Sequence, residues 1–94
     1  MNLRFMPEAE NALFELGLWV ESRNTEGSGS RFINTMIDKI ATYALPAVKY
    51  PTCKNKVLAA RKLSCISIND WVIAFTQSKD EFLVHYILYG PGLK

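Results

Sequence analysis

Hydrophobic residues in the C-terminal third of the chain follow the alternation expected of β-strands. Residues 62–68, 71–77 and 82–90 form three short runs rich in β-branched and aromatic residues. The dipeptide Asn69-Asp70 separates the first two runs, and the polar segment 78–81 separates the last two. Short apolar runs joined by polar turns of two and four residues predict an antiparallel meander of three strands.

Both faces of this meander are expected to be apolar, because successive side chains of a strand point to opposite sides. In the middle run, one face carries Trp71, Ile73 and Phe75, and the other Val72, Ala74 and Thr76. In the last run, one face carries Phe82, Val84, Tyr86 and Leu88, and the other Leu83, His85, Ile87 and Tyr89. An antiparallel sheet normally exposes one polar face to water, so this sheet is expected to need cover on both sides.

The N-terminal half predicts a short strand over residues 2–5, followed by two helices. Residues 7–22 show apolar positions at helical spacing, and Pro7 favours the first turn. The turn at 24–30 ends this helix and offers Ser28 or Ser30 as the cap of a second, which Pro46 stops after residue 45. Gly17 is costly in a helix interior, so it is expected to mark a close approach by a neighbour. The two helices should form an antiparallel hairpin on one face of the sheet.

The other face of the sheet has no predicted cover. Residues 47–61 have no firm assignment, because Pro51 argues against regular structure there, and only a short tail follows Gly90. An uncovered apolar face implies a segment of a partner protein, with self-association as a homodimer as the competing explanation. The residues expected to line this partner-binding face are Val72, Ala74, Leu83, His85 and Ile87.

The length of 94 residues predicts one domain, 1–94, of the α+β class. A content of 49% hydrophobic and 21% charged residues excludes disordered and collagen-like chains. No apolar run is long enough to span a bilayer, and no secretion signal is evident, so a cytoplasmic location without membrane contact is expected.

Charge is distributed unevenly. Residues 1–38 carry three arginines against six acidic residues, a net −3, whereas residues 39–94 carry eight basic against three acidic residues, a net +5. The run from Lys49 to Lys62 contains five basic residues and no acidic residue. It is a candidate contact surface for an acidic partner or nucleic acid, although a solvated loop would show the same composition. Its basic residues are Lys49, Lys54, Lys56, Arg61 and Lys62.

Cofactor and metal chemistry find little support in the sequence. Cys53 and Cys65 have neither the spacing of a CxxC motif nor histidines at ligand spacing, and His85 is the single histidine. Cys65 is expected to be a small buried residue of a strand, since a disulfide would be unexpected in a reducing compartment. His85 is expected to be packed and hydrogen-bonded. We expect neither a metal nor a cofactor.

The order β-α-α-β-β-β and several short motifs resemble the RelE/ParE superfamily of bacterial toxin–antitoxin toxins. LRFMPEAENALFEL resembles that family's opening strand and first helix, and GSGSRFINTMIDKI its second helix. ARKLSCIS, NDWVIAFTQ and FLVHYILYGPGL resemble its terminal meander. The resemblance implies a type II toxin that a cognate antitoxin neutralises by lying beside the sheet, and the partner-binding face listed above would then be the antitoxin-binding face.

The residues favour one branch of that family over the other. RelE-like members cut mRNA in the ribosome and place basic residues along the meander, whereas ParE-like members poison DNA gyrase by binding and tend to have an apolar middle strand. The middle strand here is WVIAF, with Val72 where a RelE-like arginine would be expected, so the resemblance favours a ParE-like toxin that acts by protein binding.

Two alternatives remain open beside the ParE-like interpretation. A RelE-like mRNA endonuclease would use Tyr89 as proton donor, with Arg61 or Lys62 supplying the positive charge that the transition state needs. An inactive relative would only bind antitoxin. The sequence therefore leaves open whether the chain is an enzyme.

Overall fold

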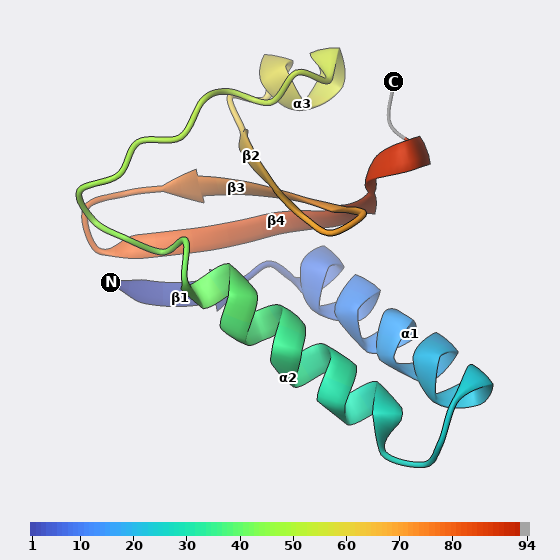
Figure 1. Ribbon diagram of the computed structural model, residues 1–94. Coiled ribbons are helices and arrows are strands. Elements are labelled where there is room, and N and C mark those ends of the chain that lie inside the picture. The colour runs from blue at the N-terminus through green and yellow to red at the C-terminus, as the bar shows by residue number, and fades with distance from the viewer. Residues whose placement is uncertain (93–94) are drawn as a thin grey trace.

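The computed structural model describes residues 1–92 and shows an α+β fold in which a helical hairpin packs on a four-stranded sheet (Figure 1). The elements in chain order are β1 (Asn2–Phe5), α1 (Pro7–Arg23), α2 (Ser28–Ala41), α3 (Lys56–Ala60), β2 (Ser64–Ile68), β3 (Trp71–Gln77), β4 (Glu81–Tyr89) and a 3-10 turn (Gly90–Gly92). The predicted strands and the start of the first helix are confirmed. The second helix ends at Ala41, earlier than predicted. No helix among these residues has the length and apolar character needed to cross a membrane.

The sheet is mixed, so the prediction of a purely antiparallel sheet is wrong in one strand. The strand order is β1-β4-β3-β2, in which β2, β3 and β4 form the predicted antiparallel meander. β1 pairs with β4 in parallel, with Asn2 opposite Glu81 and Phe5 opposite Val84. Alternation of apolar residues reports which face a side chain occupies but carries no information on strand direction, and this is why the sequence did not reveal the parallel pair.

The hydrophobic core lies between the sheet and the helical hairpin. α1 and α2 pack against one face of the sheet, as predicted. Phe75 and Phe82 are fully buried at its centre, and their rings stack with centroids 4.1 Å apart. The other buried members are Ala9, Leu13, Met36, Ile40, Ile66, Ile68, Ile73, Val84 and Ile87.

Two glycines allow α1 and α2 to approach closely, which confirms the role expected for Gly17. A Cβ atom built on Gly29 would lie well under 3.0 Å from the Gly17 carbonyl oxygen, closer than real Cβ atoms come to such a neighbour. A Cβ atom on Gly17 would collide with the side chain of Ile33. The clash at Gly29 is the more severe, because a backbone carbonyl cannot rotate away as a flexible side chain can.

Gly29→Ala is expected to destabilise the protein by about 2 kcal/mol, because the added methyl group would force the helices apart and outweigh the better helix propensity of alanine. The midpoint of urea unfolding at neutral pH measures this loss. Ser30→Ala is the matched control, since Ser30 is exposed on the same helix turn. A Gly29→Ala variant as stable as the parent chain would contradict the close contact.

The side chain of Glu21, and not Ser28 or Ser30, caps the second helix. The residue at the cap position is Gly27, whose backbone φ of 86° lies in the left-handed region that favours glycine, and it offers no side chain. The backbone N–H groups of Gly27 and Gly29 each donate to the Glu21 carboxylate at 2.7 Å. The predicted serine cap is therefore wrong, because a carboxylate from the preceding helix already occupies the helix N-terminus.

Acid is expected to weaken this cap. The two backbone hydrogen bonds, from Gly27 and then Gly29, hold the pKa of Glu21 below its ordinary value, with a further contribution from the charge of Arg31. Because the folded-state pKa is depressed, the stabilisation is complete above the ordinary glutamate value of about 4.3 and is lost as the pH falls through the folded-state value.

Glu21→Gln should therefore melt at a lower temperature than the parent chain at neutral pH. The difference between the two melting temperatures should shrink as the pH falls below about 4.3, the ordinary pKa of glutamate. Melting temperatures of both proteins from neutral pH to strong acid test this. Glu15→Gln, at an exposed position of the same helix, is the control. A gap that stayed constant across the acid range would show that the Glu21 charge does not cap α2.

The chain itself covers the middle of the sheet face that was expected to be bare. The segment between α2 and β2, with α3 within it, passes over the sheet on the side away from α1 and α2 (Figure 1). Cys53, Leu58, Leu63 and Ala74 are buried there as a second, smaller apolar cluster. The prediction of an uncovered face is thus wrong at its centre. The reason is that residues 47–61, which had no assignment, supply the missing layer.

Candidate functional site

A β-bulge in β4 brings two neighbouring polar side chains to the sheet face that α3 covers. Ala74 pairs with Tyr86 while the next residue, Phe75, pairs with Val84, so His85 is left without a partner across the ladder. A bulge interrupts the alternation of side chains and re-aims those beside it. Tyr86 packs against the small apolar cluster on this face, and His85 also reaches this face. Strict alternation had placed these two residues on opposite sides.

Four side chains form the candidate site, which we call the Arg61 cluster: Arg61, Thr76, His85 and Tyr86. The Arg61 guanidinium donates a hydrogen bond to the Tyr86 hydroxyl and also lies 5.1 Å from the centre of its ring. His85 Nε2 and Thr76 Oγ1 share a hydrogen bond of 2.9 Å. The His85 and Tyr86 rings are 6.4 Å apart between centroids. Arg61 is exposed and the other three are half-buried, so the cluster is open to solvent.

The short helix α3 positions Arg61. The Asn55 side chain caps it by accepting hydrogen bonds from the N–H groups of residues 57 and 58, and Leu58 anchors it in the small apolar cluster. At its end, the N–H of Leu63 donates to the Leu58 carbonyl and that of Lys62 to the carbonyl of residue 59. These two hydrogen bonds together form a Schellman motif. Lys62, at φ 61°, occupies the position that glycine usually takes in this motif. The motif fixes where the chain leaves α3 and so where Arg61 lies.

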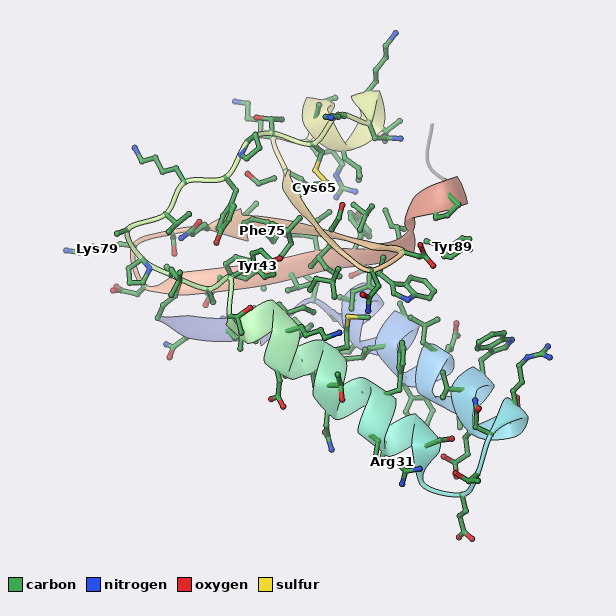
Figure 2. All side chains as sticks on the ribbon, in the orientation of Figure 1. Arg31, Tyr43, Cys65, Phe75, Lys79 and Tyr89 are labelled. Carbon is green, nitrogen blue, oxygen red and sulfur yellow. A yellow bond between two sulfur atoms is a disulfide. The ribbon has the colours of Figure 1, made fainter. Side chains whose placement is uncertain are left out.

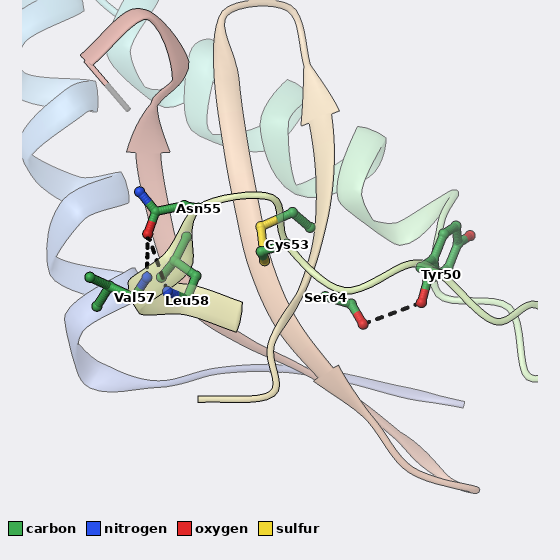
Figure 3. The surroundings of a disulfide bond; sticks show 7 residues. Tyr50, Cys53, Asn55, Val57, Leu58 and Ser64 are labelled. Carbon is green, nitrogen blue, oxygen red and sulfur yellow. Dashed lines mark hydrogen bonds between the residues drawn. A yellow bond between two sulfur atoms is a disulfide. The ribbon is translucent and has the colours of Figure 1, made fainter. Parts of the chain in front are cut away.

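A disulfide between Cys53 and Cys65 ties the segment before α3 to strand β2 (Figure 3). Thr52 forms an isolated bridge with Ser64, and the Cys53 N–H donates to the Leu63 carbonyl at 2.9 Å. This short antiparallel contact brings the two Cα atoms to 4.8 Å, a distance suited to a disulfide. The expectation that Cys65 is a free buried thiol is therefore wrong, because the unassigned segment runs alongside β2.

The three candidate catalytic residues of the sequence do not come together. Arg61 and Lys62 lie at the end of α3, whereas Tyr89 lies against Trp71 with ring centroids 5.2 Å apart. Tyr89 and Trp71 line a groove with residues of α1, on the helix side of the sheet. Figure 2 shows Tyr89 and Lys79 at opposite ends of the molecule. The tyrosine that accompanies Arg61 is Tyr86, three residues earlier.

The residues expected to share a partner-binding face are also divided by the bulge. Val72, Leu83 and His85 are half-buried. Ala74 is fully buried beneath the chain's own cover, and Ile87 is buried in the main core on the opposite face. The expectation that these five residues form one accessible face is wrong for Ala74 and Ile87.

The five basic residues predicted as one contact surface are distributed over neighbouring sites. Lys49 and Lys62 line a polar hollow beside the β3–β4 hairpin. Lys54 lines a separate hollow next to the disulfide, and Lys56 is exposed at the start of α3. Arg61 belongs to the Arg61 cluster. All five are exposed, so each adds positive charge to the surface of the molecule.

Three large apolar side chains are exposed on α1, and none of the three lies on the sheet face predicted to be bare. Phe14, Leu18 and Trp19 are 61%, 56% and 56% exposed. Beside Trp19, a groove of about 590 Å³ is lined by Leu16 and Trp19 from α1 and by Trp71, Ile87 and Tyr89 from the sheet. Phe14 and Leu18 lie on another side of α1, beside Ile33 of α2. These exposed apolar side chains are a candidate contact surface for another protein.

The Arg61 cluster combines the groups needed for acid–base chemistry on a phosphodiester. The imidazole of His85 can accept a proton, and the Tyr86 hydroxyl can donate one. Because the Tyr86 oxygen accepts the Arg61 hydrogen bond, the hydroxyl proton of Tyr86 is free to point elsewhere. Sequence reasoning missed Tyr86, since only the bulge brings it to the face of His85. Thr76 was not selected, although alternation had placed it on the same face as His85.

No group of three His, Cys, Asp or Glu side chains within residues 1–92 is arranged to hold a metal ion. Comparison with protein-family models and with curated proteins finds no match to this chain. The resemblance to the RelE/ParE superfamily therefore stays a prediction that the residues and their order support.

Proposed function

We propose that this chain is an RNA endonuclease of the RelE-like toxin class, with the Arg61 cluster as its active site. The observation that carries the proposal is the contact of Arg61 with Tyr86 beside His85 on one solvent-accessible sheet face. The sequence had argued against this branch because the middle strand lacks a basic residue. In the fold, the end of α3 supplies the missing cation.

The proposed reaction is an internal transfer within the RNA chain. His85 takes the proton of a ribose 2′-hydroxyl, whose oxygen attacks the adjacent phosphorus. The bond from phosphorus to the leaving 5′-oxygen breaks, and Tyr86 gives its proton to that oxygen. The products are a 2′,3′-cyclic phosphate and a free 5′-hydroxyl. Arg61 stabilises the extra negative charge on the phosphoryl oxygens in the transition state, and Thr76 orients His85 through their hydrogen bond.

A cognate antitoxin is the proposed partner that keeps the toxin inactive. The exposed apolar residues of α1 and the groove between Trp19 and Tyr89 support a protein contact there. The antitoxin itself rests on the family resemblance. An antitoxin bound on this side would leave the Arg61 cluster uncovered, so inhibition would also require a segment that extends round the molecule.

A second candidate function is the ParE-like one, in which the chain inhibits DNA gyrase by binding and cleaves nothing. Exposed apolar residues of α1 favour it, since Phe14, Leu18 and Trp19 stay exposed in the single chain. The inactive relative, which only binds antitoxin, is the third alternative. Neither of these accounts for the contact between Arg61 and Tyr86 beside His85.

Induction of the chain in a bacterium separates the three functions. An endonuclease should stop growth and leave mapped cuts in translated mRNA, with 5′-hydroxyl ends. Induction of the DNA-damage response with stalled gyrase and intact mRNA would instead support the ParE-like function. Unchanged growth with intact mRNA would support the inactive relative. Cuts that persisted in a chain lacking both Arg61 and Tyr86 side chains would contradict the proposed site.

A further inference from the structure

A polar hollow beside the Arg61 cluster gathers three lysines from three parts of the chain. Lys49 comes from the segment after α2, Lys62 from the turn after α3, and Lys79 from the β3–β4 hairpin. The hollow has a volume of about 550 Å³, and Ser64, Thr76 and Ser78 add hydroxyl groups to its lining. Lys79 was not among the basic residues that the sequence grouped together, because the hairpin is far from the others along the chain.

The positive charge of the hollow is not balanced by acidic side chains in its lining. No carboxylate lines it. The one ion pair among residues 1–92 joins Arg4 to Glu81, so none of the three lysines is paired with an acidic side chain there. Three positive charges around one hollow attract anions and raise their local concentration. Lysines are also flexible point charges, which suit a polyanionic backbone better than a single rigid ligand.

The hollow and the Arg61 cluster adjoin each other at Thr76. Thr76 lines the hollow and is also the hydrogen-bond partner of His85. Lys62 lines the hollow and directly follows Arg61 in the chain. A ligand with anionic groups at regular intervals could therefore place one group at Arg61 and a neighbouring group among the lysines.

We propose that this lysine hollow binds a backbone phosphate of single-stranded RNA, next to the phosphodiester held at the Arg61 cluster. The inference rests on the proposed function, which it deepens by naming the subsite that holds the substrate in register. Single-stranded RNA fits better than a duplex, because α3 stands beside the cluster and a flexible strand can pass along its edge. Hydroxyl groups in the lining can add hydrogen bonds to the phosphate oxygens.

The test is binding of a short, fluorescently labelled 2′-O-methyl RNA, which has no free 2′-hydroxyl and cannot be cut, to the full chain. The double variant Lys49→Gln/Lys79→Gln should bind roughly tenfold more weakly at moderate salt. Its slope of log affinity against log salt should be smaller by about 0.7, because a single strand contributes about 0.7 for each phosphate contact and the hollow supplies one. The variant Arg23→Gln/Lys39→Gln removes the same charge from the helices and should bind like the parent chain.

Failure of the subsite and failure of the proposed function give different results. If the parent chain cuts unmodified RNA but the lysine variant binds the uncleavable RNA as tightly as the parent, the subsite is wrong and the function stands. If the lysine variant binds more weakly but the parent chain cuts no RNA, the endonuclease proposal is wrong and the subsite stands. Equal binding of poly-glutamate, weakened equally by the lysine substitutions, would overturn the assignment to RNA.

Discussion

Arg61→Gln is expected to slow RNA cleavage by roughly 10²- to 10³-fold, the usual loss when one preorganised donor of transition-state charge stabilisation is removed. The guanidinium contacts Tyr86 and is exposed, so it can reach both the proton donor and a phosphate. The rate of product formation from a labelled RNA, measured in single-turnover conditions, gives the size of the loss. Arg23→Gln, an exposed arginine of α1, should cut at the parent rate.

Two tyrosines of β4 provide a matched comparison for the same site. Tyr86→Phe removes the proposed proton donor and should slow cleavage by about 10²-fold or more, with both proteins equally folded by circular dichroism. Tyr89→Phe makes the same chemical change near Trp71, on the helix side of the sheet, and should leave the rate unchanged. Slow cleavage by Tyr89→Phe and an unchanged rate for Tyr86→Phe would support Tyr89 as the proton donor and contradict the assignment of Tyr86.

Loss of the Cys53–Cys65 disulfide is expected to destabilise the protein by about 3 kcal/mol, because the link closes a short loop and restricts the unfolded chain. For a domain of this size, that corresponds to a fall in melting temperature of roughly 12–24 °C. Cys53→Ala/Cys65→Ala, compared with the oxidised parent by thermal and urea unfolding, measures the effect. α3 should also hold Arg61 less firmly in the variant, so cleavage should slow.

Reduction of the parent chain supplies the control for this prediction. Dithiothreitol should lower the melting temperature of the parent towards that of the double variant and leave the variant unaffected. A parent chain that melts at the same temperature with and without reductant, and that carries two titratable thiols before treatment, would show that the two cysteines are not linked. The cytoplasmic location stays a prediction, and a linked pair would have to form against the reducing conditions of that compartment.

The fold followed from local signals to a large extent. The three meander strands were visible because β-branched and aromatic runs are separated by polar turns, and α1 began at Pro7 as the sequence predicted. Gly17 was recognised as a packing position because glycine is unfavourable inside a helix without a compensating contact. The cap by Glu21 was missed, since a carboxylate eight residues from Gly29 gives no signal in the sequence that distinguishes it from an ordinary surface residue.

The candidate site was predictable only in part. Arg61 and Lys62 were selected as candidate site residues, and the structure places Arg61 against Tyr86. His85 was expected to be hydrogen-bonded, as it is to Thr76. Tyr89 was selected from the family resemblance, and Tyr86 was passed over because strict alternation along β4 does not reveal the bulge at His85. A single unpaired residue reverses the faces of every later side chain in the strand, and this also explains why Ile87 is in the core.

The sequence by itself determined the α+β class, the helical hairpin and the antiparallel meander, because these depend on periodicity and turn residues that act over a few positions. The tertiary structure alone decided the parallel pairing of β1, the disulfide, the cover that residues 47–61 give the sheet, and the meeting of Arg61 with Tyr86 and His85. Each of these joins segments far apart along the chain or depends on a local break in the ladder. Periodicity describes only what repeats within one segment, so it cannot specify them.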